Sequence, residues 1–191
     1  MTKFENIASA AVILLRDNID TDQIIPARFL KVTDRGGLGQ SLFADWRSKV
    51  EFPLNAAFAT APRIFVTGHN FGCGSSREHA VWALMDFGFR AVVSTGFADI
   101  FRQNALKNGL LPIVLTPADH LSLVESLRAD PSGTCEVDLS QQTVRAGPAG
   151  PFNFPIDSFS KKCLLEGIDE LGYLLSYAEA ISSYEKQTSA G

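Results

Sequence analysis

One short run of the chain gathers most of the residue types that could do chemistry. Residues 68–80, here called the serine loop, read GHNFGCGSSREHA and contain two adjacent serines, an arginine, two histidines and three glycines. The run follows a strand-like apolar segment and opens a predicted helix, whose free N–H groups and positive dipole end would favour an anion near Ser75 and Ser76. Arg77 can bind a carboxylate through two parallel hydrogen bonds. The pattern therefore predicts a site for a small anion.

Helix capping is the competing interpretation of the same residues. Ser75 and Glu78 have the S-x-x-E spacing of a capping box, in which two side chains bond opposite backbone N–H groups. Capping alone does not explain three glycines within seven residues, a second serine, or an arginine in a first turn where the dipole disfavours positive charge. Gly72 and Gly74 would also let another group approach the backbone closely. These features favour anion binding over capping.

Other chemistries fit the loop less well. The phosphate-loop pattern fails because no lysine follows Gly74, and the dinucleotide pattern G-x-G-x-x-G fails because its third glycine is missing. The G-x-S-x-G elbow of hydrolases fails because Arg77 takes the place of its second glycine. His69 and His79 lie ten residues apart with no third ligand nearby, so we expect them to pack or to hydrogen-bond, not to bind metal. Cys73 would need a positioned base to act as a nucleophile, and we expect it to line the site as a small, oxidisable residue.

The elements that must position this loop alternate along the chain. Short β-branched runs predict strands, and helical spacing with Gly and Pro boundaries predicts helices. The expected strands are Ala10–Leu15, Arg63–Thr67, Ala91–Thr95, Leu111–Leu115, Cys135–Leu139, Thr143–Ala146 and Phe152–Phe154. The expected helices are Ser76–Phe87, Ala98–Asn108, Pro117–Ala129 and a tail over residues 157–185, with possible breaks at Gly167 and Gly172. The sequence therefore predicts an α/β fold with a parallel sheet and a later antiparallel region, in a single domain over residues 1–191.

One long segment does not fit this alternation. Residues 17–39 carry four aspartates, one proline and three glycines. Loops of this length in compact domains are usually functional or mobile. An Asx-rich surface turn followed by a disordered hairpin is the simpler interpretation, and a site loop over residues 18–39 is the functional one.

Composition excludes several classes of protein. With 46% hydrophobic residues the 191-residue chain can bury a core, and a net charge of -4 without Lys/Arg runs gives no footprint for nucleic acid or an anionic membrane. The run Ala10–Leu15 is too short to span a bilayer, and it is followed by Arg16 and Asp17, not by the small residues of a signal-peptide site, so we expect a cytoplasmic protein. Three scattered cysteines exclude a disulfide framework and a cluster or zinc site held by this chain alone.

The serine loop resembles a signature of the aconitase superfamily, and within it the small subunits of the bacterial isopropylmalate dehydratases. Three further segments agree in order and spacing: NIDTDQIIP at Asn18–Pro26, LFADWR at Leu42–Arg47, and GFADIFRQNALKNGLLPI at Gly96–Ile113. The match spans the chain from about Ile19 to Leu115. It implies a swivelling β/β/α three-layer domain with a mostly parallel central sheet and extra antiparallel strands, and a short helix at Leu42–Arg47.

The resemblance also implies a reaction and a partner. Members of the family interconvert 2- and 3-hydroxy acids by removing and re-adding water, and isopropylmalate isomerisation in leucine biosynthesis is the implied case. A [4Fe–4S] cluster on a large subunit would bind the hydroxyl of the hydroxy-dicarboxylate substrate, so this chain would hold no metal and would act in a heterodimer or heterotetramer. A hydro-lyase for citraconate (methylmalate), dimethylmalate or homoaconitate, or a non-catalytic anion-binding domain, remains open.

The same resemblance implies roles for individual residues. Ser75 would take a proton from carbon as an alkoxide, stabilised by helix-end N–H groups and Arg77. Asp22 would approach the serine loop as a second catalytic residue, Ser76 would bond the substrate, and Arg77 would hold a carboxylate. The residues implied to face the variable part of the substrate are Phe29, Leu30, Lys31 and Val32, with Arg28, Lys31 or Arg35 available for a third carboxylate. Those implied to support the loop are Gly72, Cys73, Gly74 and His79.

Overall fold

The computed structural model describes residues 1–30, 36–57, 61–175 and 177–178. Its strands are β1 (Ile7–Ser9), β2 (Ala11–Leu14), β3 (Ile64–Thr67), β4 (Ala91–Ser94), β5 (Leu111–Val114), β6 (Cys135–Asp138), β7 (Thr143–Ala146) and β8 (Ala149–Asn153). Its α-helices are α1 (Thr21–Ile24), α2 (Pro53–Ala57), α3 (Glu78–Phe87), α4 (Asp99–Asn108), α5 (Pro117–Ala129), α6 (Ser158–Glu166) and α7 (Glu170–Leu175). Two short 3₁₀ helices are η1 (Ala27–Phe29) and η2 (Leu38–Ser41).

A four-stranded parallel sheet forms the centre of the molecule. Its order is β2-β3-β4-β5, and α3 and α4 make the crossovers between its last three strands. Successive side chains of a strand point to opposite faces, so Phe65 packs in one hydrophobic cluster with α3, whereas Ile64 and Val66 pack in a second cluster on the other face. Both faces are therefore covered, as the continuous apolar runs predict.

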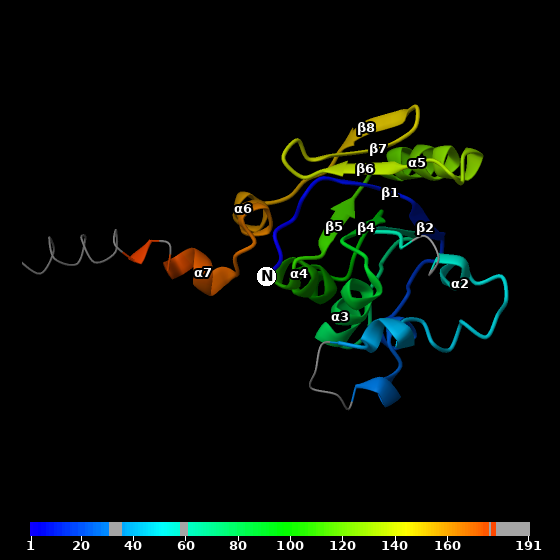
Figure 1. The fold of residues 1–191 in the computed structure, drawn as a ribbon, viewed down its shortest axis with the longest axis horizontal. Helices are drawn as coiled ribbons and strands as arrows, with labels where there is room; N and C mark the ends of the chain where they lie inside the picture. Colours follow the sequence, from blue (N-terminus) through cyan, green and yellow to red (C-terminus); the bar gives the residue numbers. More distant parts are fainter. Residues whose placement is uncertain (31–35, 58–60, 176, 179–191) are drawn as a thin grey trace, which may run out of the picture.

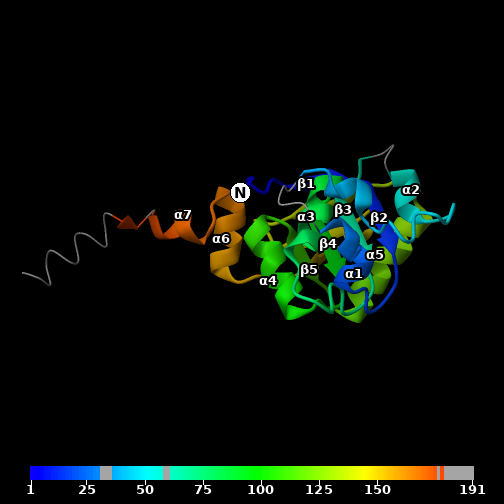
Figure 2. The ribbon, with the colours of Figure 1, turned by 90° about the horizontal axis from the view of Figure 1, so that it is seen from below.

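The second sheet is antiparallel and has the order β1-β6-β7-β8. Its inward residues, among them Ile7, Val137 and Val144, share the second cluster with Leu123 and Leu127 of α5. Figure 1 shows α3 and α4 on one side of the parallel sheet and the antiparallel sheet and α5 on the other, and both Figures 1 and 2 show α6 and α7 extending from one end. The predicted α/β class, with a parallel sheet and separate antiparallel strands, is confirmed.

Three sequence-based expectations are wrong in detail. The expected strand Ala10–Leu15 corresponds to β2, but β1, which directly precedes it and belongs to the other sheet, was not expected. The segment Leu42–Arg47 is a series of turns instead of a helix, with Phe43 in the left-handed region at φ 52°. Helix α3 begins at Glu78, two residues later than predicted, because the chain is still extended at Arg77.

The segment after β2 is more ordered than an irregular loop. It contains α1 and η1, and the side chains of Ile19, Ile24 and Ile25 are fully buried in the cluster under α3. These apolar anchors hold the start of the segment on the body of the molecule. The expected disordered hairpin at residues 31–35 lies outside the described residues.

The C-terminal helices partly match the predicted tail. Gly167 ends α6 in a left-handed conformation at φ 72°, as expected, but Gly172 lies inside α7 and does not break it. The part of the predicted tail beyond residue 178 lies outside the described residues. Over the described ranges, no helix is long and apolar enough to cross a membrane.

Candidate active site

Three loops meet where the parallel strands end. The segments after β2, β3 and β4 join through two isolated parallel bridges, Asp20 with Cys73 and Phe71 with Phe97. Carboxyl ends of neighbouring parallel strands share one edge of a sheet, which is where α/β proteins commonly place ligand sites. The fold therefore brings the two sequence motifs at Asn18–Pro26 and at the serine loop together.

Backbone hydrogen bonds fasten the first motif to the serine loop. The Gly72 N–H donates to the Ile19 carbonyl at 2.8 Å, and the Thr21 N–H donates to the Cys73 carbonyl at 2.9 Å. The buried Thr21 hydroxyl donates to the Ser75 carbonyl at 2.9 Å. The backbone of Ser75 is thus fixed by a residue 54 positions earlier in the chain.

The capping box is found at a different place from the one considered in the sequence. Asp20 accepts from the Gln23 N–H at 2.7 Å, and the Gln23 side chain accepts from the Asp20 N–H at 3.0 Å, so the box begins α1. The cap of α3 is Arg77, which makes no side-chain capping bond. Capping as an explanation of Ser75 is therefore wrong, and both Ser75 and Ser76 precede the helix.

The two serine side chains face solvent. Ser75 and Ser76 are exposed, and with respect to the described part of the chain neither hydroxyl makes a hydrogen bond. A hydroxyl that has no structural partner is available to a substrate. This availability is what a base or a substrate-binding group requires.

Asp22 and Arg77 form an ion pair between the two motifs. The Arg77 Nη1 atom contacts the Asp22 Oδ1 atom, and the side chains are 21% and 52% exposed. The pair lies beside the fixed Ser75 backbone. Thr21, which bonds the Ser75 carbonyl, directly precedes Asp22, and Ser75 lies two residues before Arg77. The structure therefore brings together Asp22, Ser75 and Arg77, three residues singled out from the sequence.

Two glycines give the loop its shape. Gly72 has φ 77° and Gly74 has φ 88°, in the region that residues with a side chain rarely adopt. A Cβ atom on Gly72 would lie 2.2 Å from the Phe101 ring, so this position has no room for a side chain. The backbone at Gly72 therefore approaches α4 closely, as the sequence pattern predicts.

Cys73 does not have the surroundings of a nucleophile. Desolvation raises the pKa of its thiol, and the charge of Asp20 raises that pKa further, against a smaller opposing backbone hydrogen bond. A raised pKa keeps the thiol protonated at neutral pH. Its partly buried side chain fits the predicted role of a small residue lining the loop.

The histidines are accounted for by packing and hydrogen bonds. The His79 ring lies 4.6 Å from the Trp82 ring, and His69 Nδ1 lies 3.3 Å from the Thr95 hydroxyl. In the described ranges there is no group of three or more His, Cys, Asp or Glu side chains that could hold a metal ion.

The residues expected to contact the variable part of the substrate are only partly described. Phe29 and Leu30 are half-buried and pack against the hydrophobic cluster under α3. Arg28 stacks over the Phe29 ring at 4.7 Å and pairs with Asp45, so it is engaged on the surface. Lys31, Val32 and Arg35 lie outside the described residues.

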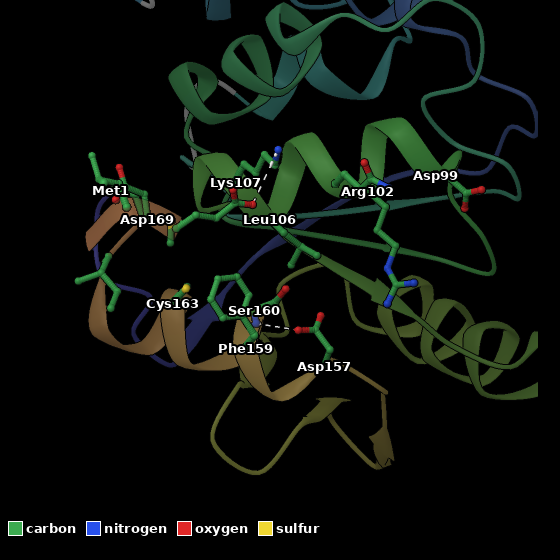
Figure 3. A pocket seen from close by; sticks show the side chains of 14 residues that line it. Met1, Asp99, Arg102, Leu106, Lys107, Asp157, Phe159, Ser160, Cys163 and Asp169 are labelled. Atoms are coloured by element: carbon green, nitrogen blue, oxygen red, sulfur yellow. Dashed lines mark hydrogen bonds and ion pairs between the residues drawn. The ribbon is translucent and has the colours of Figure 1, made fainter. Parts of the chain in front are cut away.

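A cavity of about 710 Å³ lies elsewhere, between α4 and the C-terminal helices (Figure 3). None of the described residues that line it belongs to the Asp22 segment or the serine loop. Its wall carries four carboxylates against two cationic side chains, Arg102 and Lys107. An anionic substrate is better served by the serine loop, where the partly exposed Arg77 lies beside serine hydroxyls that face solvent.

Sequence reasoning missed the buried polar groups that hold the serine loop at its ends. The Ser94 hydroxyl lies 2.6 Å from the Gly68 carbonyl, and His120 Nε2 lies 2.8 Å from the Thr67 carbonyl. Asn108 bonds the first residue of α3, Glu78, at 2.9 Å. The only sequence signal for them is a polar residue inside an apolar or helical pattern, which does not name its partner.

The fold and the site together define an α/β domain that presents a Ser–Ser–Arg loop at the carboxyl edge of a parallel sheet. The family model described as the aconitase C-terminal domain matches residues 1–118. A 3-isopropylmalate dehydratase small subunit from Herpetosiphon aurantiacus is 52% identical over 190 residues, covering 100% of this chain and 96% of that protein. The corresponding subunit from Anaeromyxobacter dehalogenans is 54% identical over 94% of this chain and 95% of its own length.

A solved structure supports the same relationship. The 3-isopropylmalate dehydratase from Methanocaldococcus jannaschii superposes with a TM-score of 0.65 at 27% identity, over 95% of this chain and 99% of that chain. The chain therefore belongs to the aconitase C-terminal domain family, together with the 3-isopropylmalate dehydratase small subunits.

Proposed function

We propose that this chain is the small subunit of a 3-isopropylmalate dehydratase, which isomerises 2- and 3-isopropylmalate by dehydration and rehydration in leucine biosynthesis. The observation that carries the proposal is the meeting of Asp22, Ser75 and Arg77 at one edge of the sheet in a chain of this family. The whole chain would act as one swivel-type domain in a cytoplasmic enzyme. Residues 18–39 would form its substrate loop and residues 157–185 its helical tail.

The reaction assigns Ser75 the transfer of a proton. As an alkoxide, Ser75 Oγ would take a proton from the carbon next to the departing hydroxyl, the electron pair would form the double bond, and hydroxide would leave. Hydroxide would then add to the carbon that lost the proton, and Ser75 would return its proton to the carbon that lost the hydroxyl, which restores the alkoxide. The cationic Arg77, two positions further along the loop, would favour the negatively charged form of Ser75.

Arg77 would hold a substrate carboxylate. Its guanidinium already pairs with a carboxylate in this structure, that of Asp22 on the side of α1, which supports a carboxylate-binding role. A substrate carboxylate would share or replace this contact. Asp22 would thus keep Arg77 oriented while the site waits for substrate.

Removal of the hydroxyl needs a Lewis acid, and the buried cysteines of the described part of the chain do not suit an iron–sulfur cluster. Burial raises the pKa of Cys135 to about 12 and also raises the pKa of Cys163, and both lie in the hydrophobic interior. Neither fits the open thiolate ligand of an iron–sulfur cluster. We therefore assign the cluster to a large partner subunit, in a heterodimer or heterotetramer.

The variable side of the substrate is proposed to face the segment around Phe29 and Leu30. Their half-buried apolar side chains favour an isopropyl group over a third carboxylate. Citraconate, dimethylmalate and homoaconitate are the competing substrates. Comparing kcat/KM for all four on one preparation ranks them directly.

Reconstitution tests the proposal. The tagged chain, expressed in its own host, should co-purify with a larger Cys-rich iron–sulfur protein, and the pair should form alkene from 3-isopropylmalate, followed by absorbance. Neither chain alone should form alkene from 3-isopropylmalate. A pair that forms no alkene from any of the four substrates would favour the non-catalytic anion-binding domain instead.

A further inference from the structure

Most of the buried polar side chains in the described ranges bond to one stretch of the chain. Within the described ranges, five polar side chains are buried: Thr21, Thr67, Ser94, Asn108 and His120. Thr67 ends β3 directly before the serine loop, and the other four bond to the stretch from Thr67 to Glu78. Buried polar groups are costly unless bonded, so this concentration marks the stretch that the fold holds most specifically.

Asn108 is the member of this group that holds the end of the stretch nearest Arg77. It is the last residue of α4, and its Nδ2 atom donates to Glu78 Oε1 at 2.9 Å and to the Asn104 carbonyl at 2.9 Å. Its Oδ1 atom accepts from Trp82 Nε1 at 2.9 Å. Both amide hydrogens and the carbonyl oxygen of Asn108 are therefore in use.

These bonds hold the start of α3 where no side-chain cap is present. Arg77 is the N-cap residue, and its guanidinium, which has donors only, makes no capping bond and reaches Asp22. Glu78 and Trp82 are four residues apart, so they lie on one face of the helix, and Asn108 binds both. The first turn of α3 is thereby fixed from α4, at the point where Arg77 leaves the helix.

We propose that Asn108 is a positioning residue for Arg77, acting through Glu78. By fixing the first turn of α3, the Asn108 amide sets the direction in which the Arg77 guanidinium leaves the loop. The kinetic part of this inference rests on the proposed function, in which Arg77 binds a substrate carboxylate. The placement of the helix start does not, and it can be measured on the isolated chain.

An exchange of donor and acceptor tests the pairing. Asn108→Asp keeps the acceptor for Trp82 but sets a carboxylate against Glu78. Adding Glu78→Gln restores a donor, because the glutamine amide can donate to the new aspartate. The double variant thus rebuilds the bond between residues 108 and 78 in reverse with nearly the same side-chain volumes, while the Asn104 carbonyl loses its donor in the single and the double variant alike.

In the reconstituted enzyme, Asn108→Asp should raise KM for 3-isopropylmalate by about five- to tenfold, the scale of one typical intramolecular hydrogen bond. Its kcat should change by less than about twofold, since Ser75 is fixed separately by Thr21. The double variant should return KM to within about twofold of the parent. Hydrogen exchange at residues 77–80 of the isolated chain should speed up in the single variant and recover in the double.

Controls separate positioning from loss of stability. Ser126→Ala removes a 2.6 Å bond to the Ala146 carbonyl, far from the serine loop, and should lower stability without raising KM. If Asn108→Asp does not fold, Glu78→Ala removes the same bond from the half-buried helix start and should raise KM in the same way.

Each outcome of these measurements supports or overturns either the positioning role or the proposed function. An active parent enzyme with unchanged KM in Asn108→Asp or Glu78→Ala, or a double variant that fails to recover, would overturn the positioning role. A parent pair that is inactive would count against the proposed function alone, and the exchange measurement would still decide whether Asn108 fixes the start of α3.

Discussion

Ser75 and Arg77 are held by different neighbours, although only one residue separates them. Thr21 fixes the Ser75 carbonyl, whereas Asp22 holds the Arg77 side chain. Both neighbours come from the start of α1, so one short helix sets the position of the proposed base and of the proposed carboxylate ligand. Residue identity and backbone placement therefore make separate contributions that substitutions can distinguish.

Arg77→Lys should weaken substrate binding while leaving the fold intact. Lysine keeps the charge but loses the planar pair of donors that a carboxylate accepts. We expect KM for 3-isopropylmalate to rise by about tenfold, the effect of about 1.4 kcal/mol. Steady-state kinetics measures it, with Arg145→Lys in the Arg145–Glu136 pair of the antiparallel sheet as a matched control that should change nothing. Unchanged KM and kcat in Arg77→Lys would refute the carboxylate contact.

Cys73→Ser should retain turnover. The raised pKa of Cys73 keeps its thiol protonated, so it should react slowly with iodoacetamide at neutral pH and contribute no nucleophile. Serine has nearly the same size and fits the same half-buried place. Mass spectrometry of the alkylated peptide and the activity of the pair check both points, and loss of activity in Cys73→Ser would show that the thiol takes part in the reaction.

At the scale of elements, the local sequence pattern predicted helices whose bounds are set by nearby residues, but not the pairing of strands with distant residues. Helix α5 was predicted at its observed bounds because Pro117 opens it and its apolar residues recur at helical spacing. The change of sheet at Ala10 escaped prediction because strand partners are set by distant residues, Cys135 for β1 and Ile64 for β2. The Asp20–Gln23 capping box was visible as D-x-x-Q, but the same letters also fit a surface turn.

The residues of the candidate site could be predicted from the sequence, but the hydrogen bonds that hold them in place could not. The glycines, serines and arginine of residues 68–80 predicted an anion-binding loop, and the family resemblance added Asp22 to the candidate site. The bonds from Ser94, Asn108 and His120 connect elements far apart in sequence, and single buried polar residues carry no signal of their partners. Such contacts are a property of the packed elements, so only the structure shows them.

Gly72→Ala should damage the serine loop more than Gly37→Ala damages its own turn. Both glycines have positive φ, 77° and 83°, but a Cβ at Gly72 would meet the Phe101 ring, whereas a Cβ at Gly37 meets nothing within 4 Å. We expect strain of about 1 kcal/mol at Gly37 and a further 1–3 kcal/mol, roughly, from overpacking at Gly72. Urea unfolding gives both values, and equal losses would show that α4 yields to the new methyl group.

At the scale of the whole molecule, the serine loop is connected to the layer on the far side of the parallel sheet. His120 of α5 lies in that layer, is buried, and bonds the Thr67 carbonyl at the end of β3. Desolvation lowers the pKa of His120, and the Thr67 bond and the Asp17 charge oppose the shift only in part. The stability of the folded layers should therefore depend on pH through this residue.

The sign follows from proton binding. As pH falls through 6.5, the ordinary pKa of histidine, the unfolded chain gains a proton at His120 while the folded chain stays neutral to lower pH. The free energy of unfolding should thus decrease below that pH, by at most about 1.4 kcal/mol per pH unit from this group. His120→Gln keeps a donor for Thr67 and should flatten the decrease in urea unfolding measured across this range. The same slope in both proteins would contradict the assignment.

The most direct test of the account is the rate of alkene formation by the reconstituted pair carrying Ser75→Ala. Ser75 is exposed and its hydroxyl makes no bond with the described part of the chain, so the variant should fold and assemble as the parent does. Loss of a proton-transferring base should lower kcat on 3-isopropylmalate by about 10²–10⁴-fold, with co-purification of the large subunit unchanged. Near-normal kcat in an assembled Ser75→Ala enzyme would contradict the account, because the proton would then be taken by another group.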